Sequence, residues 1–215
     1  MTQSELTPQE YFKAAQQPVT WLLSAESLRD AAEVVIRRED EFLVPYLRAY
    51  DEAVKIAVAN AYAEGEKAGH AEIPCRTPNY PPALVLYAYA IENVLKGLIV
   101  ANDPSLIDGD KLNAVLRTHE LVDLAKRADF VVHVEEKPVL RALSELSVWA
   151  GRYPVAQNVR DFVGTPNPDE LMDYGSRHSI MRAFLDRALR ALEAKLPKPI
   201  HNRLSTVVVF RQPGT

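Results

Sequence analysis

One stretch of the sequence, residues 83–101, constrains the fold more than any other because it is apolar on almost every side of a helix. A helix of this kind lies either at the centre of a protein core or across a membrane. Glu92, Asn93 and Lys96 interrupt the stretch near its middle, where a membrane span should carry no such polar groups. The stretch is therefore predicted to be the central, most buried helix of a soluble protein.

Helical patterns lie on both sides of this central segment. Residues 45–67 carry an apolar stripe at helical spacing. The members of the stripe are Leu47, Tyr50, Val54, Ala57, Val58, Ala61 and Tyr62. Pro45 should break or kink a helix, or begin a second one. Residues 70–82 contain four prolines and are predicted to form a loop, whereas residues 135–150 and 169–196 are predicted helices.

The predicted fold class is all-α, an up-and-down helical bundle with an N-terminal helical arm and a short C-terminal β-strand. The strand signal is the β-branched run at residues 205–210. We expect three regions, which are an arm and helix over residues 1–44, the bundle over residues 45–196 and a tail over residues 197–215. A lone strand needs a partner, and the same strand from a second copy would supply one in a dimer.

Composition indicates an ordinary globular protein of a reducing compartment. The chain has 215 residues, of which 47% are hydrophobic and 25% are charged. Its single cysteine, Cys75, cannot form an internal disulfide, and its polar first ten residues lack the apolar segment of a secretory signal. We expect a cytoplasmic protein that has no membrane partner. The formal net charge of -4 does not indicate a general nucleic-acid binder, although it says nothing of a local basic cleft.

Glu92 is the most informative polar residue, because a carboxylate inside a packed core must be paired, hydrogen-bonded or protonated. Lys96 lies one helical turn later and can pair with it, and His119, near a predicted helix start, is a second candidate partner. The favoured interpretation is a structural polar network within the bundle. The alternative is a functional cleft, in which His119 is an acid, a base or a phosphate contact.

Arg152 and Tyr153 follow a predicted helix and precede a proline. An arginine in this place can bind phosphate through two parallel hydrogen bonds or cap the last carbonyls of a helix, and the structural role is favoured. The sequence contains no P-loop, dinucleotide fingerprint, nucleophile elbow or metalloprotease motif. A lone cysteine also argues against a thiolate zinc site. We therefore predict no cofactor and no metal.

Four short motifs, taken in order, resemble the HEPN superfamily. They are YAIENVLKGL at residues 89–98, HELVDL at residues 119–124, LSEL at residues 143–146 and GRYP at residues 151–154. The resemblance covers about residues 45–196. It implies a bundle of the HEPN type, a homodimer, and RNA, a nucleotide or a partner protein as the ligand.

Many HEPN proteins are metal-independent ribonucleases, often toxins or defence effectors, and carry an arginine followed after four to six residues by a histidine. This sequence departs from that signature, because neither Arg152 nor His178 has a matching partner at the required spacing. Arg127 and His133 have the spacing but lie between two middle helices. The resemblance therefore implies a non-catalytic binding or interaction protein, while enzymatic activity stays an open question.

Two other interpretations stay open. The first is a ribonuclease with a divergent site, in which Arg152, His119 and Glu92 are the candidate catalytic residues. The second is a structural helical protein whose partner binds residues 1–44. Under any interpretation that involves a ligand, the candidate binding residues are Lys96, Arg117, Tyr153 and Asn158.

Overall fold

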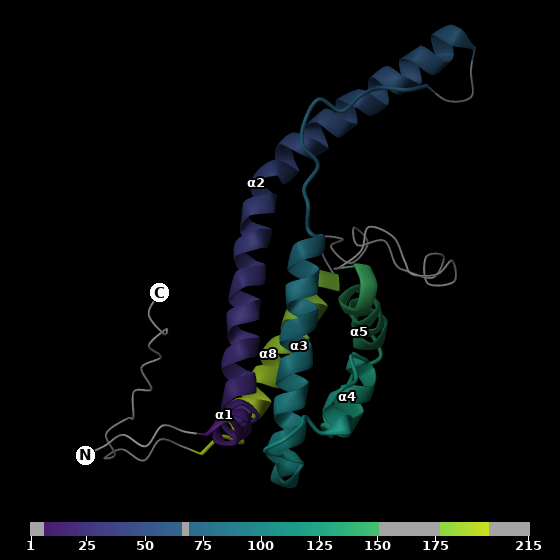
Figure 1. The fold of residues 1–215 in the computed structure, drawn as a ribbon. Helices are drawn as coiled ribbons and strands as arrows, with labels where there is room; N and C mark the ends of the chain where they lie inside the picture. The colour runs from purple at the N-terminus through teal and green to yellow at the C-terminus, as the bar shows by residue number, and fades with distance from the viewer. Residues whose placement is uncertain (1–6, 66–68, 151–176, 198–215) are drawn as a thin grey trace, which may run out of the picture.

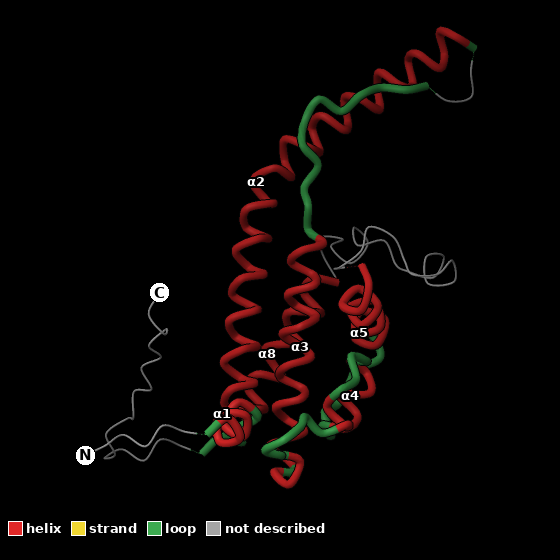
Figure 2. The backbone as a smooth tube through the Cα atoms, viewed as in Figure 1, coloured by secondary structure: helices red, strands yellow, loops and turns green. Residues whose placement is uncertain are grey.

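The computed structural model describes residues 7–65, 69–150 and 177–197. Within these ranges the chain is all-α and contains no β-strand (Figure 2). The predicted all-α class is confirmed for this part of the chain. The predicted strand at residues 205–210 lies outside the described residues.

The helices follow one another along the chain and are numbered as in Figure 1. The longer ones are α1 (Pro8–Ala15), α2 (Pro18–Glu64), α3 (Pro81–Asn102), α4 (Leu121–Arg127), α5 (Glu136–Glu145) and α8 (Arg177–Glu193). The short ones are the 3₁₀ turns η1 (Pro104–Leu106) and η2 (Ala114–Leu116) and the π-helical segment η3 (Leu146–Ala150).

Helix α3 is the centre of the bundle, as the sequence predicts. Helices α2, α4, α5 and α8 all pack against it (Figure 1). Its side chains Tyr87, Ile91 and Leu95 are fully buried. Length and composition alone would let α3 cross a membrane, but 78% of its most apolar window is buried inside the protein, as in the core helix of a soluble bundle.

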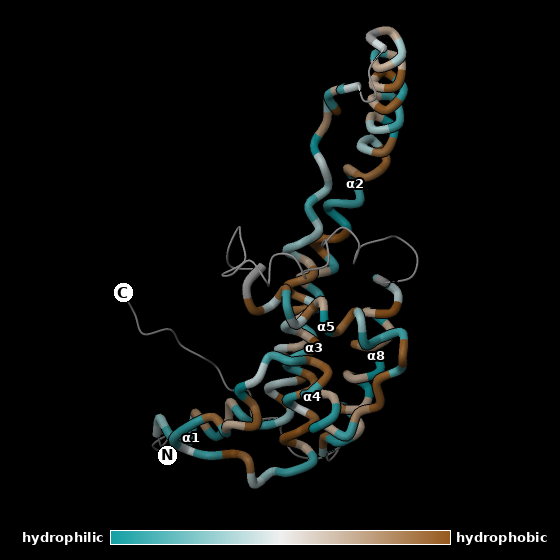
Figure 3. The backbone as a smooth tube through the Cα atoms, turned by 90° about the vertical axis from the view of Figure 1, so that its right-hand side faces the viewer, coloured by the Kyte–Doolittle hydropathy of each residue, from teal (hydrophilic) through white to brown (hydrophobic). Residues whose placement is uncertain are grey.

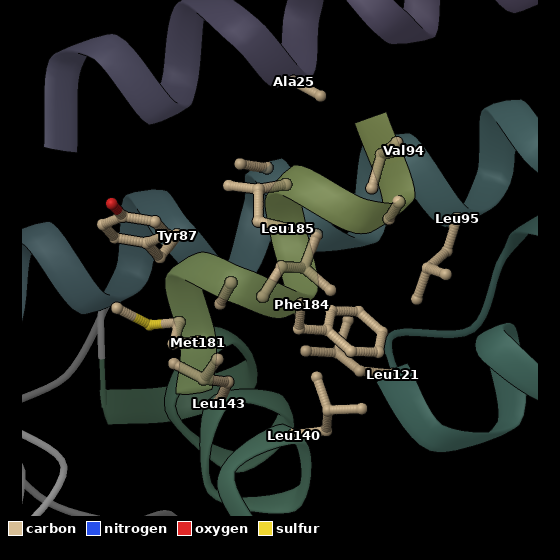
Figure 4. Close-up of a cluster of buried hydrophobic side chains, with 14 of the residues drawn as sticks. Ala25, Tyr87, Val94, Leu95, Leu121, Leu140, Leu143, Met181, Phe184 and Leu185 are labelled. Carbon is tan, nitrogen blue, oxygen red and sulfur yellow. The ribbon is translucent and has the colours of Figure 1, made fainter. Parts of the chain in front are cut away.

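The core joins side chains from every large helix of the bundle. Figure 4 shows this cluster, with Ala25 from α2, Tyr87, Val94 and Leu95 from α3, Leu121 from α4, Leu140 and Leu143 from α5, and Met181, Phe184 and Leu185 from α8. The Phe184 ring meets Phe130 edge to face, with ring centroids 5.4 Å apart, which is a favourable aromatic geometry. Helix α8 is thereby fixed to the loop that follows α4.

Helix α2 is a single helix of 47 residues that bends near its middle (Figure 1). Pro45 lies inside it, and a proline ring removes one backbone hydrogen bond and is the usual cause of such a bend. Of the predicted outcomes at Pro45, the structure shows the kink within a continuous helix. The expected boundary between residues 44 and 45 falls inside α2, and residues 18–44 contribute Leu22 and Ile36 to the core.

Beyond the bend, residues 46–64 project away from the bundle, and residues 69–80 return beside them (Figures 1 and 3). We call residues 46–64 the protrusion and residues 69–80 the returning segment. The helix ends at Gly65, whose φ of 69° is left-handed and therefore favours glycine. The returning segment and the protrusion lie very close at Gly69, where a Cβ atom would stand 2.0 Å from the carbonyl oxygen of Ala57.

Two of the predicted helices start or end differently from the expected bounds. The helix expected from Thr118 or His119 begins at Leu121, because Glu120 is still extended and forms its N-terminal cap position. The predicted helix over residues 135–150 is α-helical only to Glu145 and continues as the π-helical η3. Within the described residues the predicted last helix, residues 169–196, is α8.

Candidate functional site

Glu92, Lys96 and His119 form a single cluster between α3 and the loop before α4. The Lys96 ammonium donates to Oε1 of Glu92 over 2.5 Å, and Nδ1 of His119 lies 3.0 Å from Oε2 of Glu92. Glu92 and Lys96 are buried, whereas 47% of the His119 side chain is exposed. The structure therefore brings together three of the residues that the sequence singles out.

Both carboxylate oxygens of Glu92 are thus occupied by partners inside the protein. The ammonium of Lys96 offsets the charge of Glu92 where water cannot. Nδ1 of His119 must carry its hydrogen to donate to the carboxylate, and Nε2 of the ring has no partner within the described part of the chain. The arrangement is a structural network with one half-exposed imidazole at its edge.

Arg117 contributes to the loop and not to this cluster. Its Nε and one terminal nitrogen donate to the carbonyl oxygen of Leu112, over 3.0 Å and 2.9 Å. The guanidinium thereby joins the two ends of η2. The remaining candidates Arg152, Tyr153 and Asn158 lie outside the described residues.

A second polar cluster joins three helices and was missed by sequence analysis. Arg182 of α8 donates from Nε to Oε1 of Glu33 in α2 over 2.7 Å, and its terminal nitrogen pairs with the other oxygen. The Tyr87 hydroxyl of α3 donates to the same carboxylate. Burial alone raises the pKa of Glu33, but the hydrogen bonds from Tyr87 and Arg182 outweigh it and hold the pKa below its ordinary value.

His178 lies beside this cluster with one of its ring nitrogens buried and, within the described ranges, unpartnered. Its ring meets the Tyr87 ring edge-on at 6.0 Å between centroids. Its Nε2 atom is buried and has no hydrogen-bond partner among the residues that the structure describes. Burial, together with the nearby positive charge of Arg182, lowers the pKa of His178 below its ordinary value. The histidine is therefore held in its neutral form near neutral pH.

Two arginines of α8 bind carboxylates of other helices, Glu33, which is partly buried, and Glu136, which is buried. Arg182 holds Glu33 as described. Arg187 donates to both oxygens of Glu136 over 2.7 Å and 2.8 Å, and its guanidinium lies 4.5 Å from the centre of the Phe130 ring. No short sequence motif marks such pairs, because each joins residues that are far apart in the chain.

Another carboxylate fixes the base of the protrusion. Arg76 of the returning segment donates to both oxygens of Glu39, over 2.7 Å and 2.9 Å, and the backbone N–H of Asn79 donates to the same group over 2.8 Å. Glu39 is only 6% exposed. The Arg76 guanidinium also lies 4.4 Å from the ring centre of Phe42. These contacts give the protrusion a fixed point of departure from the bundle.

The protrusion carries large apolar side chains that nothing in the described structure covers. They are Leu47, Tyr50, Val54, Val58 and Tyr62, with exposures from 42% to 85%. We call these five residues the apolar stripe. The returning segment covers the neighbouring face, where Ala53 is buried. Sequence analysis finds this stripe, but the structure exposes it where a helix of the bundle would bury it.

An open depression of about 370 Å³ lies beside α4 and the loop after it. Its lining is formed by Val122, Lys126, Asp129, Phe130, Val131, Val132 and Lys137. The charged side chains of this lining are exposed to solvent, so they offer little electrostatic selectivity. We assign no ligand to the depression.

The fold and its surfaces define an all-α bundle with internal ion-paired clusters and a projecting helix that bears an apolar stripe. Among the described residues no group of histidine, cysteine and carboxylate side chains could hold a metal ion. Comparison with protein-family models, with curated proteins and with solved structures finds no match to this chain.

Proposed function

We propose that the chain is a HEPN-like, non-catalytic binding or interaction protein that acts as a homodimer in the cytoplasm. The observation that carries the proposal is the exposed apolar stripe of the protrusion. Contiguous apolar side chains on a surface mark a site for another protein, and a two-fold dimer covers such a patch with a copy of itself. An RNA or nucleotide ligand is proposed from the family resemblance alone.

The HEPN-like part of the proposal is supported by the position of two motifs. The helix that carries Glu92 and Lys96 is the central helix of the bundle. The helix that begins just after His119 packs against it, and the two motifs meet through the carboxylate of Glu92. This is the arrangement expected if the motifs belong to one helical bundle.

The non-catalytic part is supported by how the candidate groups are used. A catalytic acid or base must reach the substrate directly or through a water. Glu92 is buried with both oxygens bound inside the protein, and the Arg117 guanidinium holds a loop carbonyl. Glu92 is therefore not presented to a ligand, and the exposed Arg117 is engaged in the loop.

A metal-independent ribonuclease of the toxin or defence type is the second candidate, and one observation favours it. His119 is half exposed while the Glu92 carboxylate holds its Nδ1, an arrangement in which a carboxylate orients a histidine that moves protons through its other nitrogen. In this candidate Nε2 of His119 takes the proton of a ribose 2′-hydroxyl, and Arg152 stabilises charge on the phosphate.

Incubation of the purified protein with structured and single-stranded RNA separates the two candidates. The variants His119→Asn and Arg152→Ala remove the groups in question, and Arg190→Ala, an exposed arginine of α8, is the matched control. We expect intact RNA in every sample. Cleavage by the wild type and the control, lost in either of the other variants, would establish the ribonuclease and refute the proposal.

Sedimentation equilibrium tests the homodimer. The expected mass is twice the 24.1 kDa of the chain, with a concentration-dependent approach to that value. A mass of one chain at every concentration would contradict the dimeric part of the proposal, whatever the outcome with RNA.

A further inference from the structure

We infer that two copies of the chain pair antiparallel through the apolar stripe of the protrusion, with Asp51 of each copy level with Lys55 of the other. The inference deepens the proposed function, on which it rests, by naming the surface and the register of the dimer. Both are carried by the exposure, spacing and charge of residues 47–62.

The stripe has the shape of one side of a two-helix contact. Its members recur every three or four residues from Leu47 to Tyr62, so they share one face of the helix along about 22 Å at 1.5 Å per residue. The adjoining face is occupied by the returning segment, which buries Ala53 and approaches Ala57 closely at Gly69. The stripe is therefore the face that is left for a partner helix.

Charge on the flank of the stripe indicates that the partner is a second copy. Asp51 and Lys55 lie one helical turn apart on the same edge of the stripe. In an antiparallel pair with its two-fold axis at the level of Ala53, residues equally far from position 53 lie opposite one another. Asp51 then faces Lys55 of the other copy twice. A parallel pair in register would instead place this edge of the two copies on opposite sides of the contact, where Asp51 and Lys55 could not pair between copies.

The same register interlocks the apolar side chains. At a rise of 1.5 Å per residue, Val54 falls between Val54 and Tyr50 of the other copy. Tyr50 falls between Val54 and Val58, and Leu47 lies close to the level of Val58. Side chains that enter the gaps of the facing helix pack as in other helix pairs. One register therefore satisfies both the apolar and the charged positions.

The shape of the molecule permits this pairing. The protrusion extends away from the bundle at one end of the molecule (Figure 1). Two protrusions that lie antiparallel place their bundles at opposite ends, so the bundles do not collide. The present exposed pair of Lys55 with Glu52, at 3.3 Å, is of the weakly stabilising surface kind, so Lys55 can turn to Asp51 of the other copy at little cost.

The first test compares Val54→Asp with Val34→Asp by sedimentation equilibrium. Val34 is an exposed valine of the same helix, 57% exposed against 42% for Val54, on the part that belongs to the bundle. Val54→Asp places two carboxylates close to the two-fold axis, and we expect the dimer dissociation constant to rise at least about tenfold. We expect no change in Val34→Asp, and circular dichroism confirms that both variants are folded.

The second test reverses the flanking charges. Asp51→Lys alone and Lys55→Asp alone each bring two pairs of like charges level, so each weakens the dimer. The double variant Asp51→Lys with Lys55→Asp restores both opposite pairs and should return the dissociation constant toward that of the wild type. Weakening by the single variants without recovery in the double variant would overturn the register.

The third test traps the pair covalently. A Val54→Cys variant, made in a Cys75→Ser background to remove the natural thiol, should form a cross-linked dimer under mild oxidation, because position 54 faces its own copy near the axis. Val34→Cys in the same background should stay uncross-linked.

The outcomes separate this inference from the proposed function. A wild-type dimer that Val54→Asp and the charge reversals leave intact uses another face, which refutes the inference and leaves the proposed dimer standing. A wild-type monomer refutes both, and its stripe then serves another occupant, either a different protein or the tail of the same chain.

Discussion

At the scale of single residues, Lys96 keeps the buried carboxylate of Glu92 in α3 from destabilising the fold. The Lys96→Met substitution keeps the volume of the side chain but leaves the Glu92 carboxylate without its counter-charge. Loss of one partner of a buried pair costs about 3–5 kcal/mol, so we expect the free energy of unfolding to fall by that amount. Urea denaturation at neutral pH measures the loss.

Two further variants decide whether the loss comes from the orphaned charge. Glu92→Leu together with Lys96→Met removes both charges and should be more stable than Lys96→Met alone. His119→Ala removes a half-exposed partner and should cost at most about 1 kcal/mol. If the double variant is no more stable than Lys96→Met, the network contributes through packing and not through charge.

His178 makes stability depend on pH. Its pKa is lowered by burial and by the charge of Arg182, so below its ordinary pKa of about 6.5 the unfolded chain binds a proton that the folded chain resists. Stability is therefore fully present above about pH 6.5 and falls as the pH drops toward the lowered folded pKa. Glu33 and Asp40 face His178 and act in the opposite sense on its pKa, but they do not outweigh burial.

The measurement is the urea midpoint between pH 8 and pH 5 for the wild type and for His178→Gln. We expect the midpoint of the variant to change less over this range. Equal slopes in the two proteins would show that another group causes the dependence. The window lies above the range in which carboxylates titrate, so the lowered pKa of Glu33 does not interfere.

These two polar clusters differ in what the sequence reveals of them. Glu92 and Lys96 lie four residues apart on one helix, and an i,i+4 pair is visible in the sequence once the helix is recognised. Glu33, Tyr87 and Arg182 come from three different helices. Their meeting depends on how those helices pack, and local spacing carries no information about it.

At the scale of secondary-structure elements, Gly97 sets how closely three helices approach. A Cβ atom there would lie 2.6 Å from a methyl carbon of Leu192 in α8 and 2.9 Å from Cβ of Trp21 in α2. Gly97→Ala gains about 1 kcal/mol in helix propensity but overpacks a contact that costs about 1–3 kcal/mol. We expect a net loss of about 1 kcal/mol in the free energy of unfolding, measured by urea denaturation.

Gly109→Ala is the matched control for Gly97→Ala. Its added Cβ atom would meet only the far end of the Lys13 side chain, 2.9 Å away, and Gln9 at 3.7 Å. A flexible exposed lysine can move, so we expect a change within about 0.5 kcal/mol. A loss in Gly109→Ala as large as that in Gly97→Ala would argue that tight helix packing is not the cause.

The helices themselves were largely predictable, but their arrangement was not. The apolar segment at residues 83–101 predicted the central helix, and its burial in α3 confirms this. Pro45 predicted a break, a kink or the start of a second helix, and of these the structure shows the kink within α2. The apolar stripe at residues 47–62 predicted a helix with one covered face, yet a periodic pattern does not say what covers the face. The structure places this face outside the bundle.

At the scale of the whole molecule, the protein divides into a densely packed bundle and a thinly packed protrusion. The core cluster draws on α2 before its bend and on α3, α4, α5 and α8. Beyond the bend, only Ala53 is buried among the described side chains of residues 46–63. Few buried apolar contacts mean a low free energy of local opening, so the protrusion should open without global unfolding.

Hydrogen exchange measured by mass spectrometry tests both this division and the dimer. In dilute protein, amides of residues 46–64 should exchange by local opening, whereas those of α3 should exchange only through global unfolding. Raising the protein concentration increases the fraction of dimer, and dimerisation slows exchange only in the residues that the interface covers. Protection should therefore rise with concentration over residues 46–64 and stay constant over α3.

The Val54→Asp variant should lose this concentration dependence and keep the slow exchange of α3. If protection rises instead over helices of the bundle, the copies meet there, and the protrusion is then a surface for a different partner.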